Sequence, residues 1–175
     1  MKRSDRLEKE ASAQVAALMA ASARTSPKTR GIDNIEVLVI DDLPSKNRLI
    51  KKMKAISKSE NRPSLERDAN SIAASHHIVV IGVRASPAGL NCGFCGYPGC
   101  GELSATDGIC AYNSIDLGIA ADSATAIAGQ LHIDNRIMYS IGRACLELKL
   151  FSGAVKQALG IPLSITGKNP FFDRR

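Results

Sequence analysis

The sequence of 175 residues predicts an α+β fold in which helix is in excess, with α/β as the alternative. Two short runs of β-branched and aliphatic residues, at 35–40 and 78–83, have the composition of buried strands. Longer segments on either side of them repeat apolar residues at helical spacing. Between the second run and a long helical segment lies a stretch rich in Gly, Pro and Cys that follows neither period.

Five or six helices and three strands are expected in total. The helices are expected at residues 4–24, 45–58, 64–74, 113–131 and 135–148, with a short one near 153–159, and the strands at 35–40, 78–83 and 161–165. Ser4 and Ser64 are expected N-caps, and Asp134 and Asn135 are expected to cap the helix that follows them. Asp116 is expected in the first turn of its helix, where negative charge is favoured.

The length suits one domain spanning residues 1–175, because a chain of this size buries roughly 70% of its unfolded surface. Aromatic residues make up 4% of the sequence and Trp is absent, so the core is expected to be aliphatic. Within this domain, residues 86–112 are expected to form an ordered loop, called the cysteine loop below. Loops of this length are usually functional or disordered, and the cysteines indicate a function.

The basic character of the chain, with a net charge of +6, has two interpretations. Positive side chains gather in the first 30 residues and in a run at Lys46, Arg48, Lys51, Lys52, Lys54 and Lys58. Such a run is usually the solvated face of a helix, or it steers an acidic redox partner onto the protein. No aromatic residues alternate with the basic ones to form a stacking platform, so nucleic acid is not an expected partner.

The compartment is predicted from what the N-terminus and the cysteines look like. The first segment is basic but then amphipathic, without the continuous apolar stretch of a signal peptide. No run of eighteen apolar residues is present, so no membrane span is expected. Clustered cysteines in such a chain indicate reduced thiols or a metal rather than disulfides. We therefore expect a cytoplasmic protein.

Four cysteines with the spacing C-x2-C-x4-C-x9-C are the strongest chemical signal in the sequence. Cys92, Cys95, Cys100 and Cys110 lie within nineteen residues and are expected to converge on one metal centre. Glycines beside them let the backbone curl around an inorganic core, and they free N–H groups to bond to sulfur. Such hydrogen bonds also help to set a reduction potential.

Three kinds of site are compatible with these cysteines. A [4Fe-4S] cluster is the leading interpretation, because cysteine-only ligation in a Gly-rich loop is typical of such clusters. Structural zinc is the second, although zinc ribbons usually pair two C-x2-C knuckles and only one is present here. A redox-active dithiol is the third, but it would leave Cys100 and Cys110 without a role.

The remaining cysteine and the histidines are not assigned to metal. Cys145 lies on the apolar stripe of a predicted helix, where a small buried hydrophobic residue is the simpler interpretation. His76 and His77 open a strand, and His132 ends a helix. Single histidines in such places are more often structural than ligands.

The cysteine spacing resembles the Cys-Gly-x-Cys-Gly-x3-Cys pattern in the small iron–sulfur domains of corrinoid iron–sulfur proteins and of some membrane redox complexes. The fourth cysteine of those domains usually lies further downstream than Cys110 does. Cys110 is therefore the least certain of the four predicted ligands.

Nearly the whole chain resembles a prokaryotic family described as ferredoxin-domain-containing proteins. The stretches that carry the resemblance are residues 23–28, 31–34, 90–100, 110–120, 134–138, 160–164, 167–169 and 171–174. The resemblance implies a metal cluster and says little about a substrate.

A weaker similarity is to the flavin-dependent nitroreductases. Ser26-Pro27, the segment 116–118 and Ile161-Pro162 follow the order of the corresponding elements in those enzymes. The similarity implies helices packed around a small mixed sheet, a homodimer, and FMN at the subunit interface. The usual Arg-Ser-x-Arg phosphate element is missing near the N-terminus.

Four residues near the end of the first helix are the candidates to hold an FMN phosphate instead. They are Arg24, Thr25, Lys28 and Arg30. The alternative is that these basic residues complement the dipole of the helix end.

The leading hypothesis is thus a cytoplasmic electron-transfer protein with one [4Fe-4S] cluster, on a dimeric nitroreductase-like scaffold, that serves an unknown redox partner. If FMN is bound, the cluster is expected to supply it with electrons, and the protein is an oxidoreductase of unknown substrate. The alternative is a non-catalytic protein in which zinc only holds the cysteine loop in place.

Overall fold

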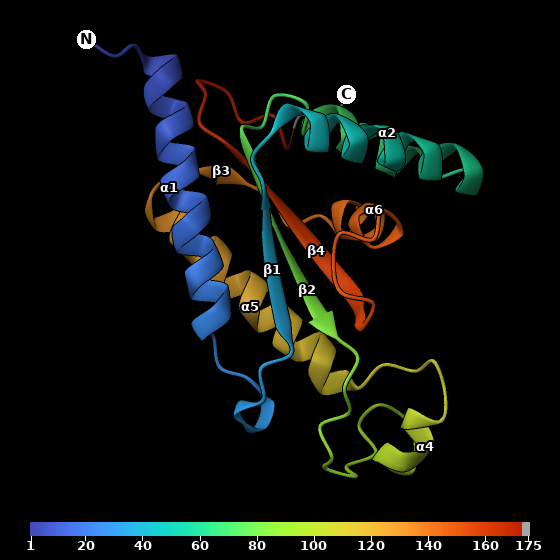
Figure 1. Ribbon diagram of the computed structural model, residues 1–175. Coiled ribbons are helices and arrows are strands. Elements are labelled where there is room, and N and C mark those ends of the chain that lie inside the picture. Colours follow the sequence, from blue (N-terminus) through green and yellow to red (C-terminus); the bar gives the residue numbers. More distant parts are fainter. Residues whose placement is uncertain (173–175) are drawn as a thin grey trace.

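A computed structural model of the protein describes residues 1–172 (Figure 1). The helices are α1 (Ser4–Thr25), the short 3-10 helix η1 (Thr29–Gly31), α2 (Leu43–Glu60), α3 (Pro63–Ser71), α4 (Cys100–Ser104), α5 (Ala111–Gln130) and α6 (Tyr139–Glu147). The strands are β1 (Ile35–Ile40), β2 (His77–Arg84), β3 (Asp134–Asn135) and β4 (Val155–Ser164).

The four strands form one sheet in the order β1-β2-β4-β3, and every pair is antiparallel. The predicted α+β fold with excess helix is confirmed, but the expectation of a mixed sheet is wrong. Ile40, at the end of β1, pairs with Ile78, near the start of β2. The chain therefore leaves β1 and enters β2 at the same end of the sheet, where α2 and α3 connect them. A connection that returns to the end it left makes the two strands antiparallel.

The sheet is covered by helices on both faces, which makes a three-layer arrangement. Side chains along β2 alternate between the two cores, as the two-residue period of a strand requires. Val79, Ile81 and Val83 pack with α1 and α5, whereas Ile78 and Val80 pack with α2, α3 and α6. Figure 1 shows α1 and α5 on one side of the sheet and α2 and α6 on the other.

Two predicted helix features are replaced by strand. Residues 155–164 form β4 from Val155 onward, so the short helix expected near 153–159 is wrong. Its residues pair with β2, for example Gln157 with Val83. Asp134 and Asn135 pair with the end of β4 as β3 and cap no helix, and α6 begins only at Tyr139. Pairing partners distant in sequence override the weak local helical preference here.

Three smaller boundary predictions also differ from the structure. Ser4 lies inside α1, whose N-cap is Arg3, and α3 is preceded by Arg62 without a side-chain cap. The long helix begins two residues earlier than expected, so Asp116 lies in its second turn. The cysteine loop also contains one short helix, α4.

The basic run on α2 is divided between the core and the solvent. Lys46 is buried and donates from Nζ to the carbonyl oxygens of Ala73 and Ser75, each at 2.8 Å. Burial lowers the pKa of Lys46. Arg48, Lys51 and Lys58 are exposed on the outer face of the helix, as expected for a solvated face.

Helix α6 approaches β4 so closely that only glycine fits at two positions. A Cβ atom on Gly142 would lie 1.8 Å from the backbone oxygen of Ala158, and one on Gly160 would lie 2.1 Å from Cγ2 of Ile141. Contacts this short do not occur between non-bonded atoms, so each glycine permits the backbones to meet. Within residues 1–172, no helix combines the length and apolarity needed to cross a bilayer.

Candidate metal centre

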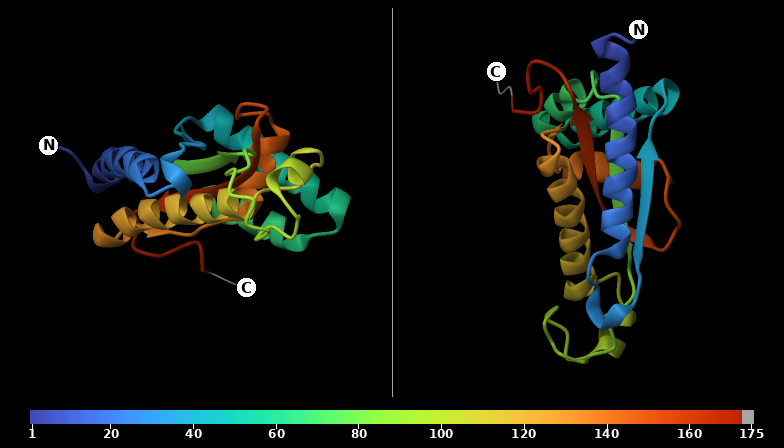
Figure 2. Two further views of the ribbon diagram at one scale, coloured as in Figure 1. Left: turned by 90° about the horizontal axis from the view of Figure 1, so that it is seen from below. Right: turned by 90° about the vertical axis from the view of Figure 1, so that its left-hand side faces the viewer.

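The cysteine loop leaves β2 and returns into α5 at one end of the sheet (Figure 1). Figure 2 shows it projecting beyond the ends of the strands. Cys110 is the N-cap residue of α5. One turn further on, the buried Asn113 accepts a hydrogen bond from the backbone N–H of Ser86, at 3.0 Å. This bond ties the start of the loop to the helix at its end.

The four predicted ligands lie around one cavity. Cys92, Cys95, Cys100 and Cys110 all line it, together with apolar groups that include Ala88, Leu90, Phe94 and Tyr97. Cys92 is exposed, Cys95 and Cys100 are half-buried, and Cys110 is buried. Among residues 1–172, no three Cys, His, Asp or Glu side chains converge closely enough to hold a single metal ion. The cysteines therefore surround a shared space without meeting at one point.

A tight turn brings Cys95 to the cavity. Gly93 and Gly96 both have positive φ, +69° and +84°, and the N–H of Gly96 donates to the carbonyl oxygen of Gly93 at 2.9 Å. L-residues rarely adopt such φ values, so glycine suits both positions. The glycines beside the cysteines thus shape the backbone as the sequence predicted.

Asn91 holds one of the predicted ligands in place, a role that was not predicted from the sequence. Its backbone N–H donates to Sγ of Cys100 at 3.4 Å, and its Oδ1 accepts from the backbone N–H of Cys100 at 2.9 Å. This reciprocal pair closes the loop across nine residues and supplies a hydrogen bond to one sulfur. An asparagine next to a glycine-rich cysteine motif was the available signal for it.

Aromatic side chains form part of the cavity wall. The rings of Phe94 and Tyr112 are 5.8 Å apart, and the Tyr97 hydroxyl lies 3.2 Å from Oγ1 of Thr106. Phe94 and Tyr97 line the cavity, whereas Pro98 is exposed and does not. Phe94 itself is 64% exposed, so this part of the cavity wall also lies on the protein surface.

Cys145 is separate from this centre. It is fully buried in the core between α6, α2 and β2, far along the chain from the cysteine loop. Burial raises the pKa of its thiol to about 12, because a thiolate is poorly solvated in an apolar environment. This agrees with the interpretation of Cys145 as a small hydrophobic residue.

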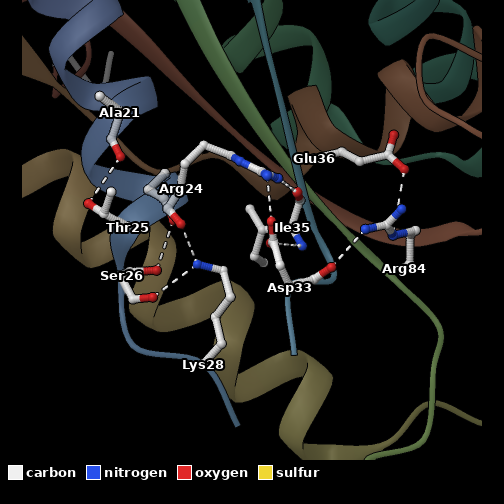
Figure 3. Close-up of polar contacts among 10 residues, drawn as sticks. Ala21, Arg24, Thr25, Ser26, Lys28, Asp33, Ile35, Glu36 and Arg84 are labelled. Carbon is white, nitrogen blue, oxygen red and sulfur yellow. Dashed lines mark hydrogen bonds and ion pairs between the residues drawn. The ribbon is translucent and has the colours of Figure 1, made fainter. Parts of the chain in front are cut away.

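The four candidates for an FMN phosphate lie between the end of α1 and η1, and each binds the chain itself. Figure 3 shows Arg24, Thr25 and Lys28. Arg24 forms an ion pair with Asp33 and donates to the carbonyl oxygen of Ile35. Thr25 Oγ1 donates to carbonyl oxygens one turn back in α1, and Lys28 Nζ donates to those of Arg24 and Ser26. A phosphate would have to displace these partners.

Arg30 differs from the other three because its side chain contacts the cysteine loop. Its Nη1 donates to the carbonyl oxygen of Ala88 at 2.9 Å, in the cysteine loop. The structure thus brings η1 and the cysteine loop together at one end of the sheet (Figure 1).

Asp116 fixes η1 against α5. It is 3% exposed, and its carboxylate accepts from the backbone N–H of Thr29 at 3.0 Å and from Thr29 Oγ1 at 2.9 Å. These residues are 87 positions apart, so sequence reasoning could not pair them. The role expected of Asp116, a charge in the first turn of a helix, is replaced by an anchor for a loop.

We expect Asp116→Ala to destabilise the fold by about 1–3 kcal/mol, because it leaves half-buried donors of Thr29 without their acceptor. Urea unfolding of the metal-free protein, followed by circular dichroism, measures this change. Asp122→Ala is the matched control, since Asp122 is exposed on the same helix and should change stability by less than about 0.5 kcal/mol. Equal effects of the two substitutions would refute the anchor.

The fold is that of the nitroreductases. A nitroreductase with bound FMN from Desulfitobacterium hafniense superposes with a TM-score of 0.63 at 12% identity, covering 89% of this chain and 78% of that one. An FMN-bound nitroreductase from Bacteroides fragilis matches equally well, at 11% identity and the same coverage. A BluB-like flavoprotein from Clostridium difficile gives 0.57 at 17% identity, covering 89% and 81%. At these identities the likeness concerns the fold.

The chain belongs to the family described as uncharacterized proteins containing a ferredoxin domain, whose model matches residues 106–174. A relative from Archaeoglobus fulgidus, described as an uncharacterized protein, is 38% identical over 168 residues, or 91% of this chain and 89% of that protein. The family resemblance predicted from the sequence is thereby confirmed. Asp173 and Arg174, which contributed to it, lie outside the described residues.

Proposed function

We propose that the protein is an iron–sulfur electron-transfer protein that carries one [4Fe-4S] cluster on Cys92, Cys95, Cys100 and Cys110. The observation that carries this proposal is the shared cavity that all four cysteines line. The description of the family as containing a ferredoxin domain supports it. When bound, such a cluster accepts and releases single electrons.

The groups around the cavity fit a cluster. The N–H of Asn91 bonds to a cysteine sulfur, which is the kind of contact that tunes clusters. Ala88, Leu90 and Phe94 give the cavity an apolar lining, of which Ala88 is buried. Cys92 is exposed, so one side of the centre is open to a redox partner.

Structural zinc is the competing assignment. A zinc ion needs all four sulfurs about 2.3 Å from one point. A cluster spreads its four irons, each with one thiolate, over a larger body. All four cysteines line one cavity, and the sequence contains only one C-x2-C pair where zinc ribbons usually have two, so the cluster is the assignment that we propose.

Anaerobic purification followed by iron, sulfide and zinc analysis tests the proposal. We expect about four iron and four sulfide per chain, together with an EPR signal that develops on reduction with dithionite. A colourless protein that retains one zinc per chain and no sulfide would refute the redox function.

Flavin is the further part of this proposal, supported by the fold that the protein shares with FMN-bound nitroreductases. Arg24, Thr25, Lys28 and Arg30 stay the predicted partners of its phosphate. Calorimetric titration of the protein with FMN tests this part. A cluster-loaded protein that binds no FMN would leave electron transfer in place and remove the flavin-linked oxidoreductase.

A homodimer through α5 completes the proposed scaffold. The outward face of α5 carries exposed Ile115, Gly118 and Ile119, with Asp122 as its only charged residue. A helix that is apolar on all sides is normally buried on all sides. A second copy of the chain, packed on this face, would provide that burial.

We expect the wild-type protein to have twice the chain mass of 18.6 kDa in light scattering after size exclusion. Ile119→Lys should produce monomers, because it places a charge in the apolar interface. Leu43→Lys is the matched control, since Leu43 is also exposed but lies at the start of α2, and it should stay dimeric. A monomeric wild-type protein would rule out the dimer.

A further inference from the structure

We propose that Arg30 raises the reduction potential of the cluster by placing a positive charge directly behind the wall of the cysteine cavity. This inference rests on the proposed function, and it gives Arg30 a different role from holding an FMN phosphate. Arg30 acts here as a positioning and tuning residue and touches no substrate.

The guanidinium of Arg30 lies against the segment that forms the cavity wall. Its Nη1 donates to the carbonyl oxygen of Ala88 at 2.9 Å, and Ala88 is 8% exposed and lines the cavity with the four cysteines. At the next residue, a Cβ atom built on Gly89 would lie 3.1 Å from the same nitrogen. The side chain thus packs on the backbone of two successive loop residues.

The guanidinium of Arg30 belongs to a solvent-exposed side chain beside the cavity wall. Within residues 1–172, the ion pairs involve other arginines and lysines, and none includes Arg30. Asp116, whose carboxylate accepts from the adjacent Thr29, keeps its own negative charge, so the field at the cavity is the sum of both groups. Removing the charge of Arg30 changes this field in one direction, by an amount that solvent screening reduces.

The backbone conformation of η1 fixes where the side chain of Arg30 begins. Its φ and ψ are 57° and 15°, in the left-handed region that a glycine adopts without strain and other residues at a cost of roughly 1–2 kcal/mol. The N–H of Gly31 bonding to Lys28, and Thr29 bonding to Asp116, hold this conformation. Strained positions that are held in this way concentrate at functional sites.

The electrostatic consequence has a definite sign. One-electron reduction adds a negative charge to the cluster, taken from an external reductant such as dithionite, and involves no proton from Arg30. A nearby cation stabilises the more negative, reduced form. Removing the charge should therefore change the ratio of reduced to oxidised cluster about tenfold at a fixed solution potential. For a one-electron couple, a tenfold change corresponds to about 60 mV.

The test is an EPR-monitored redox titration of the cluster-loaded full-length protein. Arg30→Gln should lower the midpoint potential by about 60 mV, and Arg30→Lys should restore most of it because the charge is kept. Lys51→Gln is the matched control: Lys51 is exposed on the outer face of α2, at the other end of the sheet (Figure 1), and its loss should not change the potential.

A second neutral variant guards against misfolding. Arg30→Gly removes both the charge and the backbone strain, so it should lower the potential as Arg30→Gln does while folding without penalty from φ. An unchanged potential in either neutral variant would overturn the inference, as would an equal drop in Arg30→Lys. The inference would also be contradicted if the neutral variants bound no iron while Arg30→Lys did. The charge would then be needed for assembly of the cluster and not for its potential. A wild-type protein without iron and sulfide would instead refute the proposed function.

Discussion

Cys100→Ala is expected to abolish the cluster, with iron and sulfide in the purified protein falling to background. Each iron of a [4Fe-4S] cluster takes one thiolate, so the loss of a sulfur opens one corner to water and to loss of iron. Cys100 is the thiol whose sulfur accepts the N–H of Asn91, so its removal also frees that donor. Iron and sulfide analysis after anaerobic purification, with the absorbance near 400 nm measured in parallel, gives the result.

Cys145→Ala is the matched control for this substitution. Cys145 is buried in the other core, and its raised thiol pKa keeps it protonated at neutral pH. The variant should retain the full iron and sulfide content of the wild-type protein. Retention of the cluster in Cys100→Ala, or its loss in Cys145→Ala, would show that the ligand set is wrong.

Gly142→Ala is expected to destabilise the fold by about 3 kcal/mol or more, even though alanine is the better helix former. The added Cβ would lie 1.8 Å from the backbone oxygen of Ala158, so α6 must move away from β4. The methyl group cannot turn aside, and backbone atoms of a central strand have little freedom to yield. Urea unfolding of the metal-free protein measures the loss.

Gly129→Ala separates this steric effect from helix propensity. Gly129 also lies in a helix, but a Cβ atom there meets nothing within 4 Å. The same substitution should therefore leave stability unchanged or raise it by up to about 1 kcal/mol. If Gly142→Ala were as stable as the wild type, the close approach of α6 to β4 would be refuted.

Local signals were sufficient for most elements and for the cysteine motif. The β-branched runs at 35–40 and 78–83 are strands in the structure, and the amphipathic repeat near the N-terminus is α1. The four cysteines line one cavity, because nineteen residues with glycines at the turns span a short range, and their role as ligands stays a prediction. In each case the residues involved are close together in the chain.

Long-range contacts were beyond such reasoning. Residues 155–160 have no strong local preference, and only pairing with β2 makes them strand. Thr29 and Asp116 are individually unremarkable polar residues until the fold brings them together. The antiparallel order of the sheet likewise depends on where α2 and α3 pack.

The cysteine centre shows most clearly which features follow from local sequence and which depend on long-range contacts. The kind of chemistry that we propose follows from the residue types, since thiols at this spacing among glycines are typical of cluster ligands. Only the tertiary structure identified the groups around the cysteines. Asn91 donates to a sulfur across the loop, and Arg30, 58 residues before Ala88, donates to the carbonyl oxygen of Ala88. Ligand identity is a property of side-chain chemistry, whereas the field at a cluster is a sum over charges in space. Distances in space between remote segments are set by packing, which the order of residues does not display.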